Sequence, residues 1–319
     1  MHEFEIIKKY FSKLSINTKS ALKLNDDVFF DKSRKLVISV DSYVNGVHFT
    51  DFKKPELVIK KILRSSISDL ICKGIRPKYF FISGFGNKKT FSKSNLRKIS
   101  LSLKKEQKKF GISLCGGDTV FSNKLSFTFI SVGFGNKIVY RNKAKLNDDI
   151  YVTGNLGDSY VGLKILKDEI NLNKKMNKYF INKYYHPDLH LNLANKLLSF
   201  ANTSIDVSDG LITDLEKLIN NQRLNFILDL KSIPISINLK KLLNSKKLKK
   251  LSYISQGDDY QVLFTASPDK SGIISKISKT LGIKISKIGT ISSHSQKSQI
   301  IDQKGKKIAT KNKGYYHRF

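Results

Sequence analysis

Segments with strand-like and helix-like apolar spacing alternate along the whole chain, and this alternation is the strongest constraint on its fold. Alternating apolar residues predict strands at residues 35–40, 78–85, 125–135, 149–154, 203–207 and 260–266. Apolar residues spaced on one helical face predict helices at residues 2–14, 55–73, 93–110, 158–169, 190–200, 211–221 and 270–281. Interleaved strands and helices predict an α/β or α+β fold rather than a sandwich or a bundle.

A length of 319 residues favours two domains, because a single core rarely grows to that size. The polar segment at residues 140–149 lies between two strongly predicted strands and is the expected boundary. We therefore expect an N-terminal domain over residues 1–138 and a C-terminal domain over residues 147–319.

The chain is strongly basic, with 58 Lys+Arg, 26 Asp+Glu and a formal net charge of +32. Such a charge favours nucleic-acid binding, because lysines neutralise phosphates without regard to sequence. Arginine is scarce, however, and the lysines are spread over the whole length, as coding bias alone would produce. We expect no nucleic-acid partner, and keep a basic nucleic-acid-binding protein as the alternative from a different functional class.

The sequence predicts neither a membrane segment nor a secretory signal. Apolar runs stay well below the roughly 18 residues that a spanning helix needs, and acids interrupt the apolar positions near the N-terminus. Cys72 and Cys115 are isolated, which predicts two buried thiols rather than a zinc site or a disulfide. We expect a cytoplasmic protein.

Aspartates gather beside Gly, Ser or another Asp, mostly after predicted strands. They are Asp26, Asp27, Asp41, Asp69, Asp118, Asp158, Asp206, Asp209, Asp258 and Asp259. Mg²⁺ prefers such carboxylates together with water and substrate phosphates, and converging acids would repel one another without cations. The set therefore predicts a metal–phosphate site. For single members the alternative is a helix cap, which suits Asp158 and Asp209 well.

The common nucleotide-binding motifs are missing from the sequence. It has no P-loop, no protein-kinase catalytic motifs and no complete dinucleotide fingerprint. If the protein handles ATP, it does so through metal ions and loops of small residues.

The chain resembles the thiamine-monophosphate kinases, a family of the aminoimidazole ribonucleotide synthetase-like superfamily. The ordered motifs that carry the resemblance are NDDVFF, SVDSYVNGVHF, SISDLICKGIRP, LCGGDTV, YRNKAKLNDDIYVTGNLGDSYVGL, DVSDGL, GDDYQVLFT and KGYYHRF. The resemblance implies transfer of the γ-phosphoryl group of ATP to thiamine monophosphate, giving thiamine diphosphate. It also implies an N-terminal domain that forms a homodimer through its sheet, and a site in the cleft between the domains.

The resemblance also implies roles for individual residues. The implied ligands of several Mg²⁺ ions are Asp27, Ser39, Val40 through its carbonyl, Asp41, Asp69, Asp118, Asp206 and Asp209. The implied ATP-binding residues are Gly117, Asp118, Arg141 and Ser208, and the implied substrate-binding residues are His48, Asp258 and Tyr315. Asp41, Asp118 and Arg141 are the expected catalytic residues. The family usually has Gly at Asn25, Thr at Val40 and Glu at Asp258.

Direct in-line transfer is the expected mechanism, because the acceptor is already an ionised phosphate that needs no strong general base. Tyr315, Tyr316 and Phe319 are expected to pack against the rings of the substrate. The nearest alternative is another ATP-dependent synthetase of the same superfamily.

Overall fold

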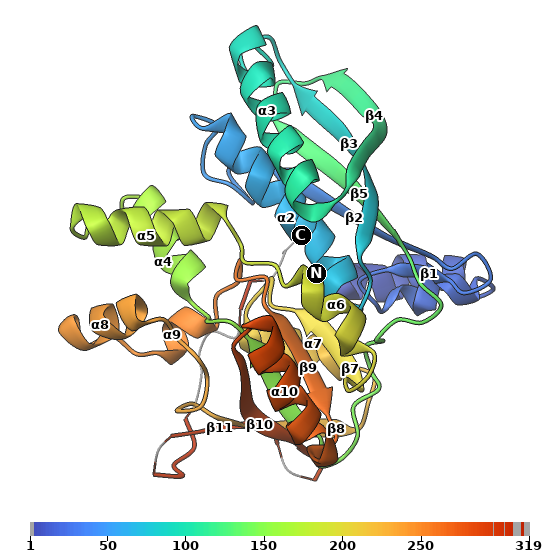
Figure 1. The fold of residues 1–319 in the computed structure, drawn as a ribbon, viewed down its shortest axis with the longest axis vertical. Helices are drawn as coiled ribbons and strands as arrows, with labels where there is room; N and C mark the ends of the chain where they lie inside the picture. Colours follow the sequence, from blue (N-terminus) through green and yellow to red (C-terminus); the bar gives the residue numbers. More distant parts are fainter. Residues whose placement is uncertain (1–2, 296, 303, 309–313, 316–319) are drawn as a thin grey trace.

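The chain folds around two β-sheets, which confirms the predicted mixture of strands and helices (Figure 1). The computed structural model describes residues 3–295, 297–302, 304–308 and 314–315. The first sheet has the order β1 (Phe29–Asp31), β2 (Leu36–Val44), β5 (Ser126–Phe134), β3 (Pro77–Gly86) and β4 (Ser113–Phe121). The second has the order β11 (Gln299–Ile301), β8 (Leu224–Asp229), β10 (Ile285–Ser293), β6 (Asp149–Thr153), β9 (Val262–Ala266) and β7 (Thr203–Asp206). The division into domains at residues 138–147 stays a prediction.

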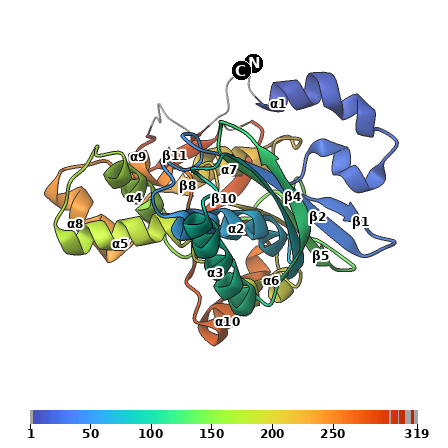
Figure 2. The ribbon, with the colours of Figure 1, turned by 90° about the horizontal axis from the view of Figure 1, so that it is seen from above.

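Two long helices, α2 (Pro55–Cys72) and α3 (Lys93–Phe110), lie on one face of the first sheet (Figure 2). Pro55 starts α2 without losing a hydrogen bond, and Ser92 caps α3 by accepting from the backbone of Asn95. The helices bury the side chains that β5 and β3 direct toward them, including Phe129 and Phe80, which are stacked.

The remaining helices pack around the second sheet and beside it. They are α4 (Asp158–Leu166), α5 (Lys174–Tyr185), α6 (Leu191–Leu197), α7 (Leu211–Leu218), α8 (Ile237–Ser245), α9 (Leu251–Ile254) and α10 (Ser271–Leu281). Strands β6, β7 and β9 are buried along their whole length, so this sheet holds the second core of the molecule.

Helix α2 connects the two sheets. Ser68 of α2 donates a 2.7 Å hydrogen bond to Asp206 of β7, and Lys73 at the end of α2 donates to the carbonyl of Ser204 in the same strand. These contacts are buried, so they fix the end of α2 against the edge of the second sheet. The loops around this junction enclose the site described below.

The first residues and several strands differ from the prediction. The helix expected at 2–14 is a short α1 (Glu3–Ile6) followed by a π-turn at 7–11 and a 3₁₀ turn at 12–15, in which only Ser15 is buried. Strands β1, β4, β8, β10 and β11 were not predicted. Cys115, expected to be buried, is exposed because it lies in the edge strand β4.

Candidate active site

A cavity of about 900 Å³ opens between the two sheets and gathers most of the predicted site residues. Those that line it are Asp27, Val40, Asp41, His48, Asp69, Arg141, Asp206, Ser208, Asp209, Asp258 and Tyr315. Ser39 lies directly behind this wall, where its hydroxyl donates to the carboxylate of Asp69. The cavity therefore brings together residues from distant parts of the chain, namely β2, α2, β7 and the loops after β7 and before β9.

Three carboxylates form the floor of the cavity, of which Asp206 is buried and Asp41 and Asp69 are partly buried. Asp41 lies in β2 and Asp69 in α2, and the two side chains are hydrogen-bonded to each other, whereas Asp206 ends β7. Burial raises the pKa of Asp41 and of Asp206 to about 7. Burial, followed by the charges of Asp41 and Asp206, raises the pKa of Asp69 well above its usual range. Because these carboxylates repel one another when ionised, bound cations would stabilise their charged forms.

Besides the contact between Asp41 and Asp69, these three acids accept hydrogen bonds from hydroxyl groups. Ser39 donates to Asp69, Ser68 donates to Asp206, and the hydroxyl of Tyr43 bonds to Asp41. In the part of the chain that the structure describes, no three His, Cys, Asp or Glu side chains already stand in an arrangement that could hold a metal ion. The donor chemistry suits Mg²⁺, because it consists of short carboxylates and hydroxyls with room for phosphate oxygens.

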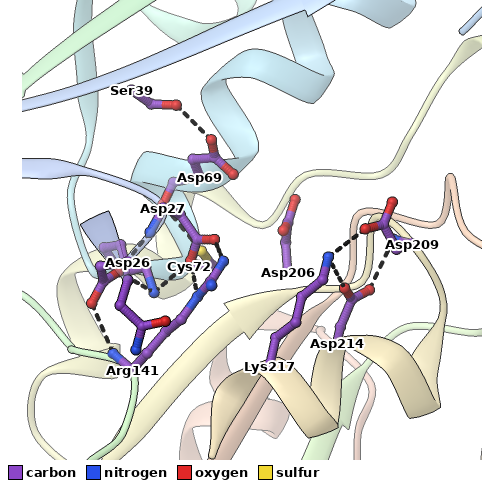
Figure 3. A network of polar contacts seen from close by, with 12 residues as sticks. Asp26, Asp27, Ser39, Asp69, Cys72, Arg141, Asp206, Asp209, Asp214 and Lys217 are labelled. Carbon is purple, nitrogen blue, oxygen red and sulfur yellow. Dashed lines mark hydrogen bonds and ion pairs between the residues drawn. The ribbon is translucent and has the colours of Figure 1, made fainter. Parts of the chain in front are cut away.

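The loop before β1 carries an acidic pair, Asp26 and Asp27, that is matched by basic side chains, unlike the three acids of the cavity floor. The ammonium group of Lys73 lies 2.8 Å from Asp26 and 2.7 Å from Asp27. The guanidinium group of Arg141 forms an ion pair with Asp27, and the backbone N–H of Arg141 donates to Asp26 at 2.9 Å. Figure 3 shows Arg141 against Asp26 and Asp27, with Asp206 lying between this group and the one around Lys217.

The loop after β7 is ordered by the helix that follows it. Asp214 of α7 accepts from the backbone N–H groups of Asp209 and Gly210, and Lys217 pairs with both Asp214 and Asp209. The proposed capping roles of Asp209 and Asp158 are wrong: Gly210 and Gly157 occupy the N-cap positions, and Asp158 instead accepts from Tyr179 and Ser236. The side chain of Asp209 is held at the cavity wall by Lys217.

The opposite end of the cavity carries the residues expected to contact substrate. His48 accepts a hydrogen bond from the backbone of Val44 through Nδ1, and Asp258 adopts the left-handed backbone region with φ 67°. Lys61 links them: its ammonium group lies 2.8 Å from Asp258 and donates to the carbonyl of His48 at 3.2 Å. The backbone N–H of Tyr315 donates to the carbonyl of Asp209, which places Tyr315 at the rim. Tyr316 and Phe319 lie outside the described residues.

Apart from Ser39, which lies behind the wall, Gly117 and Asp118 are the predicted residues that the cavity lining does not include. Both lie in β4, whose nine residues are all exposed, and Asp118 is therefore inside an edge strand rather than after one. Asp118 is the register partner of Ser83 in β3, and Ser83 is the register partner of Thr128 in β5. The hydroxyl of Thr128 is hydrogen-bonded to that of Ser42, so all of these residues lie on the exposed face of the sheet. Asp118 thus faces away from α2, whereas Asp41 faces toward it.

Sequence reasoning missed the basic residues Lys61, Lys73 and Lys217, and the acid Asp214. The available signal was the position of these residues on the predicted helices. Lys61 and Lys73 occupy buried positions of an apolar helix, where an unpaired lysine is costly, and Asp214 stands in the first turn of α7, where an acid is favourable. A lysine at a buried helical position requires an acidic partner, so Lys61 and Lys73 could have been recognised as members of buried ion pairs.

Comparison with known proteins places the chain in a family. Residues 24–135 match the family described as AIR synthase related protein, N-terminal domain. The chain is 34% identical to the thiamine-monophosphate kinase of Buchnera aphidicola subsp. Acyrthosiphon pisum, over 99% of this chain and 98% of that one. It is 29% identical to the enzyme of that name from Escherichia coli strain K12, again over 99% and 98%.

Solved structures agree with this relationship. The structure of AaThiL complexed with AMPPCP and TMP superposes with a TM-score of 0.84 at 25% identity, covering 99% of this chain and 97% of that one. The hydrogenase maturation protein HypE of E. coli shares the fold, with a TM-score of 0.68 at 16% identity over 87% of this chain and 85% of that one. By full-length similarity, the chain belongs to the thiamine-monophosphate kinase family.

Proposed function

We propose that the protein transfers the γ-phosphoryl group of ATP to thiamine monophosphate, producing thiamine diphosphate. The observation that carries the proposal is the single cavity in which buried acids, Arg141 and the expected substrate residues meet, in a chain related over its full length to kinases of that name. The cavity of about 900 Å³ is large enough for a nucleotide and a second phosphorylated ligand side by side.

Divalent ions belong to the proposal because of the buried acids. Asp41, Asp69 and Asp206 would hold Mg²⁺, which supplies neutralisation of the phosphate charges when bound. The carboxylates come from both halves of the chain, so they fix the position of the phosphates relative to both sheets. Hydrogen bonds from Ser39, Tyr43 and Ser68 hold them in place, and rigid positioning is the main contribution that a protein makes to phosphoryl transfer.

The other cavity residues would bind and orient the two substrates. Arg141, Ser208, His48 and Asp258 all line the cavity. Arg141 and Ser208 would donate to phosphate oxygens of ATP, and His48 and Asp258 would contact the thiamine phosphate. Tyr315 offers an aromatic surface to the cationic thiazolium ring. We infer direct in-line transfer, because two anionic phosphates held in one cavity require orientation rather than a protein nucleophile.

A homodimer also belongs to the proposal. Val40, Ile130 and Phe81 lie side by side on the face of the first sheet opposite α2, and Val40 is 61% exposed. Beside them, the fully exposed β4 offers an unpaired edge. A second copy packed against this face would cover it, and would give Asp118 a cavity to act in, namely that of the partner.

We also propose a cytoplasmic location, which the use of ATP and the two free cysteines support. None of the helices in the described ranges has the length and apolar character to cross a membrane.

The direct test is to incubate the protein with MgATP and thiamine monophosphate and to quantify thiamine diphosphate by chromatography. We expect one thiamine diphosphate per ADP formed. ATP hydrolysis without that product would favour another ATP-dependent enzyme of the superfamily. Stabilisation by duplex or single-stranded nucleic acid, but not by MgATP, in a thermal-shift comparison would favour the nucleic-acid-binding alternative.

A further inference from the structure

Lys73 is a buried cation that contacts two neighbouring carboxylates. Its side chain is fully buried at the end of α2, and its ammonium group contacts Asp26 at 2.8 Å, Asp27 at 2.7 Å and the carbonyl oxygen of Ser204 at 2.7 Å. An ammonium group has three N–H donors, so each donor has an oxygen partner. The group therefore joins the loop before β1, the end of α2 and strand β7.

The carboxylate oxygens of this loop are already occupied by protein donors. Asp26 accepts from Lys73 and from the backbone of Asp27 through one oxygen, and from the backbone of Arg141 through the other. Asp27 accepts from Lys73 and from Nε of Arg141 through one oxygen, and pairs with the terminal guanidinium nitrogen through the other. Two negative charges thus face two positive charges, and the pair is balanced.

The acids of the cavity floor have a different environment. Asp41, Asp69 and Asp206 interact with hydroxyl groups and with one another, and no lysine or arginine of the described ranges forms an ion pair with them at contact distance. Added cations would therefore bind at the acids of the floor, whereas the negative charges of the neighbouring loop are already neutralised by Lys73 and Arg141.

We propose that Lys73 is a built-in cation that takes the place of a divalent ion at Asp26 and Asp27. This inference rests on the proposed function, and it changes one expectation within it: Asp27 is a structural acid that orders Arg141 rather than a magnesium ligand. The ammonium group is fixed to the end of a helix, so the loop stays neutral and ordered at any Mg²⁺ concentration. Metal binding is then confined to the acids that lack a basic partner.

The first test counts bound ions without substrate. Mn²⁺ serves as the probe, and free Mn²⁺ is measured by electron paramagnetic resonance while full-length protein is titrated. Asp27→Asn should bind as many Mn²⁺ ions as the unmodified protein, whereas Asp41→Asn should lose an ion or bind about tenfold more weakly or worse. Loss of an ion in Asp27→Asn would overturn the proposal.

The second test removes the built-in cation. Lys73→Met leaves the two carboxylates one positive charge short, with Arg141 still in contact, so this variant should bind one additional Mn²⁺ ion and show a larger Mg²⁺-dependent rise in Tm than the unmodified protein. The added response should disappear in Asp27→Asn/Lys73→Met. Arg64→Met is the matched control, because it removes another buried cation of α2 whose partner Glu106 lies away from the cavity.

The proposal is wrong if Lys73→Met binds no additional Mn²⁺, or if the added response persists in the double variant. Should Lys73→Met fail to fold, the ion count of Asp27→Asn decides. Both readouts are independent of turnover. A protein that makes no thiamine diphosphate but shows these ion counts would refute the proposed function and leave the role of Lys73 intact.

Discussion

Lys61 shows how one buried side chain can organise residues from both halves of the molecule. Its ammonium group binds Asp258 and the carbonyl of His48 and lies 3.6 Å from the centre of the Tyr184 ring, whose hydroxyl also donates to His48. Burial lowers the pKa of Lys61, and the charge of Asp258 opposes that effect. Because Lys61 is 3% exposed, it acts by holding His48 and Asp258 in place.

Lys61→Met should therefore weaken substrate binding more than turnover. We expect the KM for thiamine monophosphate to rise about tenfold or more with a smaller change in kcat, because a buried charge pair that loses one member costs a few kcal/mol. Lys61→Arg should recover part of the loss. The control is the neighbouring Lys60→Met, whose partners His186 and Glu106 lie outside the cavity. A lower kcat with an unchanged KM would contradict this positioning role.

The buried acids make a second prediction at the residue scale, for the metal-free protein. The folded-state pKa of Asp41 and of Asp206 is about 7, above the value of 3.8 that an exposed aspartate has, so folded protein binds protons that unfolded protein has released. These groups therefore lower the free energy of unfolding as the pH rises from about 4 to about 7. Chemical denaturation at several pH values in the presence of a chelator measures this decline.

Mg²⁺ should cancel that decline. It competes with protons for the same carboxylates, so its stabilising effect should be larger at pH 8 than at pH 5. An Asp41→Asn/Asp206→Asn variant should lose part of the pH dependence in this window, while Asp69, Asp214 and Asp259, whose pKa values burial also raises, keep the rest. Equal stabilisation by Mg²⁺ at both pH values would show that the ions bind elsewhere.

At the scale of elements, strand β4 shows what glycine contributes to the GGD motif. Gly117 has φ 154°, and a Cβ atom at this position would lie 1.7 Å from the carbonyl oxygen of Ile82 in β3. The glycine is therefore required by the close approach of two strands. Its neighbour Asp118 remains exposed at the surface.

Gly117→Ala should accordingly destabilise the first sheet by about 1–3 kcal/mol, through strain and a displaced β4. Gly272→Ala is the control, because Gly272 lies in α10 with ordinary backbone angles and open space around it, and the change should be neutral or stabilising by roughly 0.5–1 kcal/mol. Denaturant unfolding measures both. Equal stability of the two variants would contradict the close contact between β4 and β3.

The same elements show what the sequence could predict and why the rest was missed. Strands β2, β5 and β6 carry apolar residues that pack on a helix or in a buried sheet, so the pattern of apolar residues in the sequence identified them as strands. Strand β4 is built from small and polar residues and exists because it pairs with β3, which is a tertiary effect. For the site, the acids were recognisable from their motifs, whereas Lys61 and Lys73 acquire their roles only when α2 is placed between the two sheets.

At the scale of the whole molecule, the position of Asp118 predicts that two copies cooperate. Within one chain this acid lies on the face of the first sheet opposite the cavity acids. If the open faces of two copies pack together, each Asp118 can serve the cavity of its partner. Light scattering should then report a dimer.

Mixing two inactive variants tests this arrangement. Asp41→Ala and Asp118→Ala, exchanged into mixed dimers, should recover activity up to about a quarter of the unmodified level, since half of the dimers then contain one intact site of two. Mixtures of Asp41→Ala with Asp206→Ala are the control and should stay inactive, because both acids belong to one cavity. Failure to recover activity although mixed dimers form would show that Asp118 does not serve the partner.

Phosphoryl transfer by this protein is expected to depend on acids from both sheets acting together on the phosphates of ATP and thiamine monophosphate. The most direct measurement is the rate of thiamine diphosphate formation by Asp41→Asn at saturating Mg²⁺, with circular dichroism to verify its fold. We predict a decrease of roughly a hundredfold or more relative to the unmodified protein. A correctly folded Asp41→Asn variant with near-normal turnover would contradict the account.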